Sequence, residues 1–286
     1  MLRSKRMIKL EKPQLEVSEV VDVLINSMRN SNNRKESIKK YRNELIEFEN
    51  KYDELGSKQQ LYILNSNDLN KNEEKKNDLI YLYEEKLVKS KEGRKYYNQI
   101  KANTKFDKCP YCGHERVETL DHYLPKSNYP IFSITPLNLI PACFNCNHNK
   151  LDEDINRYDE MIIHPYYDDF SKIEWLKAEV IPNEEPSFFF SVAKTEKLIT
   201  EDYNRLVHHF EVFKLAELYS ANASREFQNK KKYFKEKLLF YGNEEFIKDI
   251  KSEIESRKEK ETNTWEIAML EAIINSQWLL EEYLKS

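Results

Sequence analysis

The sequence predicts an α+β fold, in which a mainly α-helical chain encloses one short segment with strand character. Glycine accounts for only 4 of the 286 residues and charged residues for 34%, a composition typical of helix-rich proteins with long polar faces. Apolar residues recur at helical spacing over most of the chain. The exception is the stretch 109–150, which contains all four cysteines and several short apolar runs.

The first hundred residues are predicted to be mostly helical. Residues 7–12 alternate in polarity before Pro13, which favours a brief edge strand or an extended arm. The polar residues 65–77 are predicted to form a loop. Apolar side chains recur at helical spacing in four segments, namely residues 17–28, 34–55, 78–87 and 91–103.

The last third of the chain combines one hairpin with further helices. Residues 174–181 and 187–192 resemble strands, and the stretch Pro182–Pro186 between them is predicted to turn. From residue 199 onward the pattern is helical, and the last two helices are expected to form a hairpin or a partner-binding surface. We therefore expect three regions, which are a helical region 1–104, a central module 105–165 and a β-hairpin with helices 166–286.

Charge and hydropathy exclude some classes of function. No apolar run is long enough to cross a membrane, and the N-terminus lacks the apolar core of a signal peptide, so a cytoplasmic location is expected. The net charge of −4 argues against a dedicated nucleic-acid coat. Residues 86–108 are nevertheless locally basic. Five lysines are candidates for phosphate contacts, namely Lys101, Lys105, Lys108, Lys126 and Lys150.

The cysteines form two pairs that suit a metal ion. Cys109 and Cys112 make the first C-x-x-C pair, Cys143 and Cys146 make the second, and 30 residues separate the pairs. Four thiolates close a tetrahedral Zn²⁺ site, which is structural because it leaves no position open for water. Two disulfides and a redox-active C-x-x-C are the alternatives, although two matched pairs in a reducing compartment favour a metal.

Polar residues that could take part in catalysis lie between the two cysteine pairs. Residues 117–120 are predicted to form a strand that leads directly into Asp121 and His122. Residues 134–140 are predicted to form a second short strand or turn, and a helix is expected to start at Cys143. The order is therefore strand, loop, strand and helix.

These motifs resemble the HNH endonuclease superfamily. The pattern D-H-x-x-P, followed by N-L-x-x-x-C-x-x-C-N-x-x-K, covers residues 109–150, which are 42 of the 286 residues. The resemblance implies a ββα-metal fold, and the two C-x-x-C pairs match its zinc-stabilised form. It also implies hydrolysis of phosphodiester bonds with one catalytic divalent cation, Mg²⁺ or Mn²⁺.

The resemblance assigns a role to each motif residue. His122 would be the general base, with an ordinary pKa near 6.5 that suits proton transfer at neutral pH. Asp121 and Asn147 would hold the catalytic cation, and Asn138 would hold the loop or orient His122. Many members of the superfamily carry histidine as the last motif residue, so His148 is an alternative to Asn147.

A wider resemblance concerns partners. The motifs, followed by the segment His164–Tyr167, are similar to HNH proteins of bacterial anti-phage systems of the Septu and retron-linked types, which pair the nuclease with an ABC-type ATPase. His164 is expected either to pack structurally or to support the site. DNA is the expected substrate. The alternatives are an RNA-cleaving nuclease and a non-catalytic zinc-knuckle protein that binds nucleic acid or serves as a scaffold.

Overall fold

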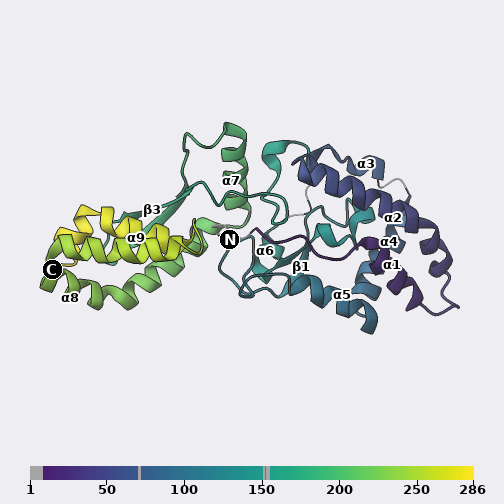
Figure 1. Ribbon diagram of the computed structural model, residues 1–286, viewed down its shortest axis with the longest axis horizontal. Helices are drawn as coiled ribbons and strands as arrows, with labels where there is room; N and C mark the ends of the chain where they lie inside the picture. The colour runs from purple at the N-terminus through teal and green to yellow at the C-terminus, as the bar shows by residue number, and fades with distance from the viewer. Residues whose placement is uncertain (1–8, 70–71, 151, 153–154) are drawn as a thin grey trace. The chain divides into compact units, whose positions relative to one another are not determined.

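The computed structural model describes residues 9–69, 72–150, 152 and 155–286 (Figure 1). The described chain is mainly helical with two small two-stranded sheets, which confirms the predicted combination of a mainly helical chain with short strands. It divides into two compact units, the first ending at Asp168 and the second running from Asp169 to Ser286. The N-terminal helices and the central module therefore lie in one unit, and a boundary between residues 104 and 105 stays a prediction.

The first unit is built from helices that surround one small sheet. Apolar faces of α1 and α2 pack against each other, and α5 packs on both strands of the sheet. Three of these helices begin near the residues that the apolar spacing predicts. The helices are α1 (Val17–Asn26), α2 (Arg34–Ser57), α3 (Ser66–Leu69), α4 (Glu73–Tyr81) and α5 (Lys91–Lys101).

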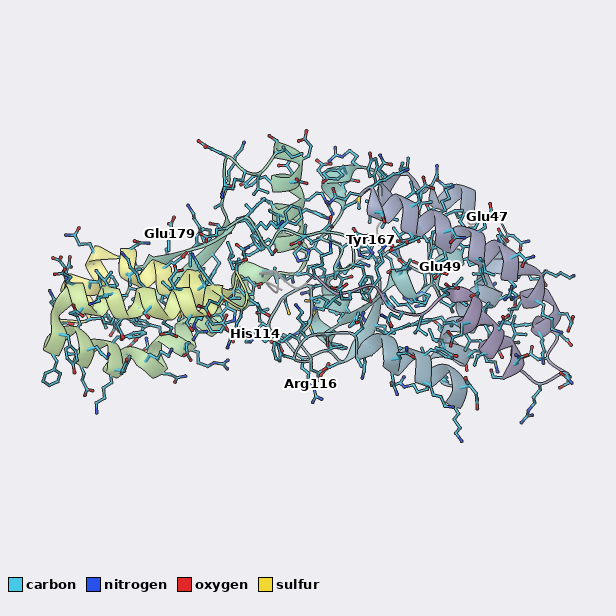
Figure 2. All side chains as sticks on the ribbon, in the orientation of Figure 1. Glu47, Glu49, His114, Arg116, Tyr167 and Glu179 are labelled. Carbon is cyan, nitrogen blue, oxygen red and sulfur yellow. The ribbon has the colours of Figure 1, made fainter. Side chains whose placement is uncertain are left out.

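A buried glutamate on α2 caps α1. The residue before α1, Glu16, makes no capping bond with its own side chain. The Val17 amide instead donates to both carboxyl oxygens of Glu49, at 3.1 and 2.9 Å. Glu49 is buried, whereas Glu47 on the same helix is exposed (Figure 2). Burial raises the pKa of Glu49 to about 7, against the opposing effect of the Val17 amide.

The loop expected at residues 65–77 is wrong in part. The stretch 65–77 is not only a loop, because it contains α3 and the start of α4. Asn72 caps α4 by accepting from the Lys75 amide at 3.0 Å, and acidic residues in the first turn favour the helix dipole. Within 7–12, residues 7 and 8 lie outside the described residues. Residues 9–12 form an extended arm, which bonds through Leu10 to the Pro165 carbonyl at 2.8 Å.

The expected single helix 78–87 is divided. It ends as α4 at Tyr81 and continues as a π-helical segment, η2 (Leu82–Leu87). A close backbone contact follows η2, because a Cβ on Gly93 would lie 2.0 Å from the Lys86 carbonyl oxygen. Glycine therefore lets α5 approach the widened turn. π-Helical turns are frequent near functional sites, and η2 carries Tyr83, which contacts the site described below.

The central module has the predicted order of elements. Strand β1 (Thr119–His122) pairs antiparallel with β2 (Leu139–Ala142), so that Asp121 faces Ile140 and His122 faces Leu139. Both strands begin later than predicted, so that β1 includes Asp121 and His122 and most of residues 134–140 precede β2. The connection contains two short 3-10 helices, η3 (Pro130–Phe132) and η4 (Pro136–Asn138). The helix α6 (Phe144–Asn149) follows β2 directly and packs on β1.

The second unit pairs a β-hairpin with helices. Strands β3 (Leu176–Ile181) and β4 (Ser187–Val192) form the predicted antiparallel hairpin, which packs on α8 (Leu215–Lys258) and α9 (Trp265–Asn275). The remaining helices of this unit are α7 (Thr200–Val212) and the π-helical η6 (Leu279–Tyr283).

The long helix α8 reverses at Gly242, where φ is 78° and ψ is 171°. Its two arms pack together, with the rings of Phe234 and Phe246 5.8 Å apart. In the part of the chain that the structure describes, no helix is both long and apolar enough to cross a membrane.

The cap on α1 predicts a pH-dependent stability. The folded pKa of Glu49, about 7, lies above its ordinary 4.5, so its stabilising contribution is complete below pH 4.5 and is lost as the pH rises through 7. Glu49→Gln keeps an acceptor for the Val17 amide but cannot ionise. We expect the melting temperature of Glu49→Gln, minus that of the wild type, to rise between pH 4.5 and 7. The exposed Glu47→Gln serves as the control, and a difference for Glu49→Gln that does not vary with pH would contradict the assignment.

Candidate active site and metal centre

The four cysteines lie together in the first unit. Cys109 and Cys112 belong to the turns before β1, whereas Cys143 caps α6 and Cys146 lies within it. All four are buried, none forms a disulfide, and their sulfur atoms lie within 4.8 Å of one another. The structure therefore brings together the two pairs that the sequence predicts as metal ligands.

The backbone around the cysteines suits a zinc knuckle. The Glu115 amide donates to Cys112 Sγ and the Cys146 amide donates to Cys143 Sγ, both at 3.4 Å. Gly113 closes the first turn with a φ of 64°. A tetrahedral ion with metal–sulfur bonds of about 2.3 Å needs sulfurs roughly 3.8 Å apart, which the cluster accommodates. Burial raises the pKa of Cys109 well above the usual thiol value. Four thiolates packed this closely would repel one another, so a cation is needed to hold them together.

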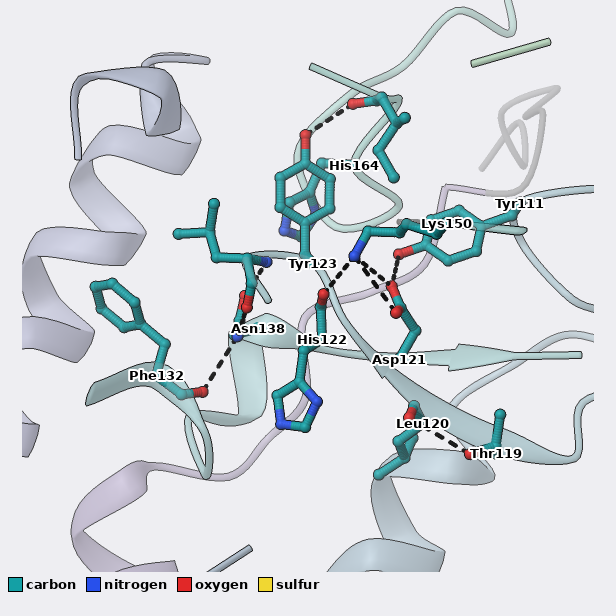
Figure 3. A network of polar contacts seen from close by, with 12 residues as sticks. Tyr111, Thr119, Leu120, Asp121, His122, Tyr123, Phe132, Asn138, Lys150 and His164 are labelled. Atoms are coloured by element: carbon teal, nitrogen blue, oxygen red, sulfur yellow. Dashed lines mark hydrogen bonds and ion pairs between the residues drawn. The ribbon is translucent and has the colours of Figure 1, made fainter. Parts of the chain in front are cut away.

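The carboxylate of Asp121 is held from both sides of the cysteine cluster. The Tyr111 hydroxyl, from between the first two cysteines, donates to Asp121 Oδ2 at 2.8 Å. Lys150, which follows α6, places its Nζ 3.3 Å from the same oxygen. Asp121 is only 6% exposed. Each knuckle thus supplies one partner to a buried carboxylate, as Figure 3 shows.

His122 points away from this pair. Consecutive residues of a strand face opposite sides, and in Figure 3 the imidazole lies on the other side of β1 from the Asp121 carboxylate. Its Nε2 lies 2.9 Å from the Ser133 carbonyl oxygen and therefore donates, which leaves Nδ1 as the acceptor. The backbone carbonyl of His122 accepts from Lys150 Nζ at 2.5 Å.

Burial changes the chemistry that the sequence predicts for His122. The side chain is 9% exposed, and the ring of Tyr83 lies edge-on at a centroid distance of 4.3 Å. Burial lowers the pKa of His122 from its ordinary 6.5 to about 3, against the opposing effect of the Ser133 carbonyl and with smaller contributions from Lys126 and Lys150. The imidazole is neutral at physiological pH and able to accept a proton, but Tyr83 restricts the approach of a reactant.

Asn138 organises the loop between the two strands. Its side chain is fully buried and accepts from the Leu124 amide at 2.8 Å. It donates to the Leu124 carbonyl at 3.0 Å and to the Phe132 carbonyl at 3.2 Å. Phe132 precedes Ser133, whose carbonyl accepts the hydrogen bond from His122 Nε2. Asn138 therefore fixes the loop and acts on His122 through that loop, without touching the ring.

A second buried layer supports Asn138. The Tyr52 hydroxyl, from α2, donates to Asn138 Oδ1 at 3.0 Å and lies 3.1 Å from His164 Nε2. The Tyr166 amide donates to His164 Nδ1 at 3.2 Å, so Nε2 carries the proton and donates to Tyr52. His164 is 1% exposed and lies behind the site, away from any open face. Its packing role thus includes support of Asn138.

The remaining predicted residues lie at the edge of the site or outside it. Asn147 is half-buried on α6, and His148 on the same helix is exposed. Lys126 forms an ion pair with Glu84 at 3.5 Å, whereas Lys150 is buried against Asp121. Among the described residues, no ion pair engages the three other candidate lysines, Lys101, Lys105 and Lys108.

Three tyrosines at the site were not predicted from the sequence. Tyr52 and Tyr83 reach it from helices far away in the chain, and no local pattern signals such contacts. Tyr111 had a signal, because it lies inside the first C-x-x-C pair and its side chain has to leave the turn on one side of the cluster.

Loss of a cysteine should release the metal. We expect Cys146→Ser to lose one equivalent of zinc per chain and to melt at least several degrees below the wild type, because the ion replaces a core in this small module. Zinc would be measured by elemental analysis of the purified protein. His114→Ala, next to the cluster but not part of it, should keep its zinc. A wild-type chain without zinc, or an unchanged zinc content in Cys146→Ser, would contradict the assignment.

The chain is similar to protein ea31 of Escherichia phage lambda. The two are 33% identical over 150 residues, which make up 50% of this chain and 50% of ea31. The chain thus spans about half the length of the curated relative that it matches. No protein-family model matches the chain, and no solved structure matches it. These comparisons establish a distant relationship over half the chain, beside a buried four-cysteine cluster that suits zinc.

Proposed function

We propose that the chain is a metal-dependent endonuclease of the HNH type that hydrolyses phosphodiester bonds in DNA. The observation that carries this proposal is the position of Asp121 and His122 at the end of β1, where α6 and its two cysteines pack against the strand. The strand, loop, strand and helix thus bring the motif residues onto one small scaffold. A purely structural knuckle has no need for this acid and this imidazole.

His122 is proposed as the general base. Its Nε2 is committed to the Ser133 carbonyl, so Nδ1 would accept a proton from the attacking water. Neutral imidazole is the form that this step requires. The lowered pKa keeps the ring neutral but also makes it a weaker base than an ordinary histidine. The Ser133 carbonyl also stabilises the positive charge that the ring gains. The Asn138 bond to the preceding carbonyl, that of Phe132, helps to fix the loop that carries Ser133.

Asp121 and Asn147 are proposed to hold Mg²⁺ or Mn²⁺. One carboxylate and one amide oxygen suit a hard cation that keeps most of its waters. Lys150 Nζ now pairs with Asp121 and would have to move aside for the ion, because two cations beside one carboxylate repel each other. When bound, the ion would stabilise charge on the phosphate and the leaving oxygen. Lys150 would then be released to contact the phosphate.

A non-catalytic zinc-knuckle protein is the second candidate function. The observation that favours it is the burial of His122 under Tyr83, which restricts access to the proposed base. An RNA substrate remains an alternative within the nuclease proposal. Action with a partner ATPase in anti-phage defence also remains part of the proposal. The net charge of −4 supports this part of the proposal, because an acidic chain would need a partner to bring it to its nucleic-acid target.

Cleavage assays test the proposal directly. Purified protein would be incubated with supercoiled plasmid and, separately, with total RNA, in Mg²⁺ or Mn²⁺ with EDTA controls. We expect metal-dependent nicking of the plasmid that falls at least about 100-fold in His122→Ala, the lower range for loss of a general base. Zinc content and melting temperature should be retained. Residual nicking close to that of the wild type would exclude His122 as the base. Cleavage of RNA alone would show that the substrate is RNA and not DNA.

The hydroxyl of Tyr111 should tune the catalytic cation. Its bond to Asp121 orients the carboxylate, and loss of such a supporting bond typically costs about 10- to 100-fold in metal affinity or activity. We expect Tyr111→Phe to need about tenfold more Mg²⁺ for half-maximal cleavage while it keeps its zinc. The matched control is Tyr97→Phe, since Tyr97 bonds to the Leu120 amide on β1 but not to Asp121. Equal Mg²⁺ requirements in both variants would exclude a role of the Tyr111 hydroxyl in cation binding.

A further inference from the structure

The outward face of α6 carries two aromatic rings beside the proposed cation ligand. Phe144 is 64% exposed, although it is a large apolar residue, and His148 is exposed one turn later. Their ring planes are parallel to within 3° and their centroids are 5.9 Å apart. The two rings therefore form an offset stack, which holds both side chains in one orientation and presents flat surface to solvent.

The helical geometry places this stack next to the site. Successive residues of an α-helix are about 100° apart around its axis. Cys146 faces the buried cluster, and Lys150, just after the helix, reaches Asp121. Asn147 then falls between the Lys150 direction and the Phe144 direction around the helix. A substrate phosphate at Asp121 and Asn147 would thus have the Phe144–His148 stack as its neighbour.

The charge of this face suits nucleic acid. The six residues of α6 read FNCNHN and include no carboxylate, and Lys150 follows them. Asparagine amides and an imidazole surround the exposed phenyl ring without repelling phosphate. Every nucleobase has a π-face, and stacking on an aromatic side chain contributes about 1–3 kcal/mol per base regardless of sequence. An exposed aromatic stack on a helix that carries no carboxylate is therefore suited to stack on a base.

We propose that Phe144 and His148 form a stacking platform for the nucleobase that adjoins the scissile phosphate. This proposal rests on the proposed nuclease function. It adds a stacking contact that holds the nucleotide beside the cleaved bond. It gives His148 a role as a ring, in place of a role as a cation ligand or base. The platform reads no sequence, so it positions the strand without selecting a site.

Binding measurements separate stacking from charge. A labelled DNA oligonucleotide would be titrated with His122→Ala protein, which serves as the uncut reference, in Mg²⁺ at several salt concentrations. Adding Phe144→Ala should weaken binding about tenfold and leave the dependence of affinity on salt unchanged, because no charge is removed. Phe144→Tyr should bind like the reference. Phe240→Ala, which removes an 82% exposed phenylalanine from the second unit, should also bind like the reference.

His148 is tested by a pair of substitutions. His148→Phe keeps a flat ring but cannot accept a proton or bind a cation, whereas His148→Ala removes the ring. The platform predicts that His148→Phe cleaves within about threefold of the wild type and that His148→Ala loses about tenfold in affinity. If both variants lose cleavage equally, His148 acts through its nitrogens and the platform is wrong.

An abasic substrate locates the stacked base. Once the cut has been mapped on one oligonucleotide, the base on either side is removed in turn. We expect one of these abasic substrates to weaken binding by the His122→Ala reference, and the same change to have no further effect when Phe144→Ala is added, since both remove one contact. Additive losses would overturn the platform while leaving the nuclease intact. A wild-type chain that binds neither DNA nor RNA would overturn both proposals.

Discussion

The contact among four buried sulfurs determines how the rest of the first unit can be arranged. It joins the turns before β1 to the start of α6, which are 30 residues apart in the chain. Neither segment has much apolar surface of its own, so a bound ion would supply the cohesion that a larger core supplies elsewhere. Tyr111 lies in the first of these segments, and Lys150 follows the second. Because both side chains bind the Asp121 carboxylate, the position of that carboxylate depends on the cluster as well.

A second constraint comes from behind the sheet. His164, Tyr52 and Asn138 form a directed chain of hydrogen bonds from a buried imidazole to the loop between β1 and β2. The Asn138 amide group also donates to two backbone carbonyls of the loop, so these bonds together favour one loop conformation. The cluster therefore fixes the acidic side of β1, and this chain of bonds fixes the side that carries the imidazole of His122.

Local patterns in the sequence anticipated much of this arrangement. The cysteine spacing, the two strands of the module and the later hairpin depend on residues close together in the chain, and the structure has all three. The start of α4 was missed because it depends on one capping bond from Asn72. The contacts of Tyr52 and Tyr83 were missed because they join segments 86 and 39 residues away, at Asn138 and His122, and only the folded chain brings those segments together. The depressed pKa of His122 follows from the same burial.

The position of Tyr83 over His122 has a consequence for the smallest fragment that could retain the site. A peptide containing only residues 105–165 would keep the cysteines and both strands, but it would lose η2 and α2. Its His122 would gain water and an ordinary pKa, while Asn138 would lose the Tyr52 hydroxyl that now donates to it. Such a fragment would have a more accessible base on a less rigid loop. The N-terminal helices thus form part of the wall of the candidate site, and the part of the chain that has to fold together is larger than the motif.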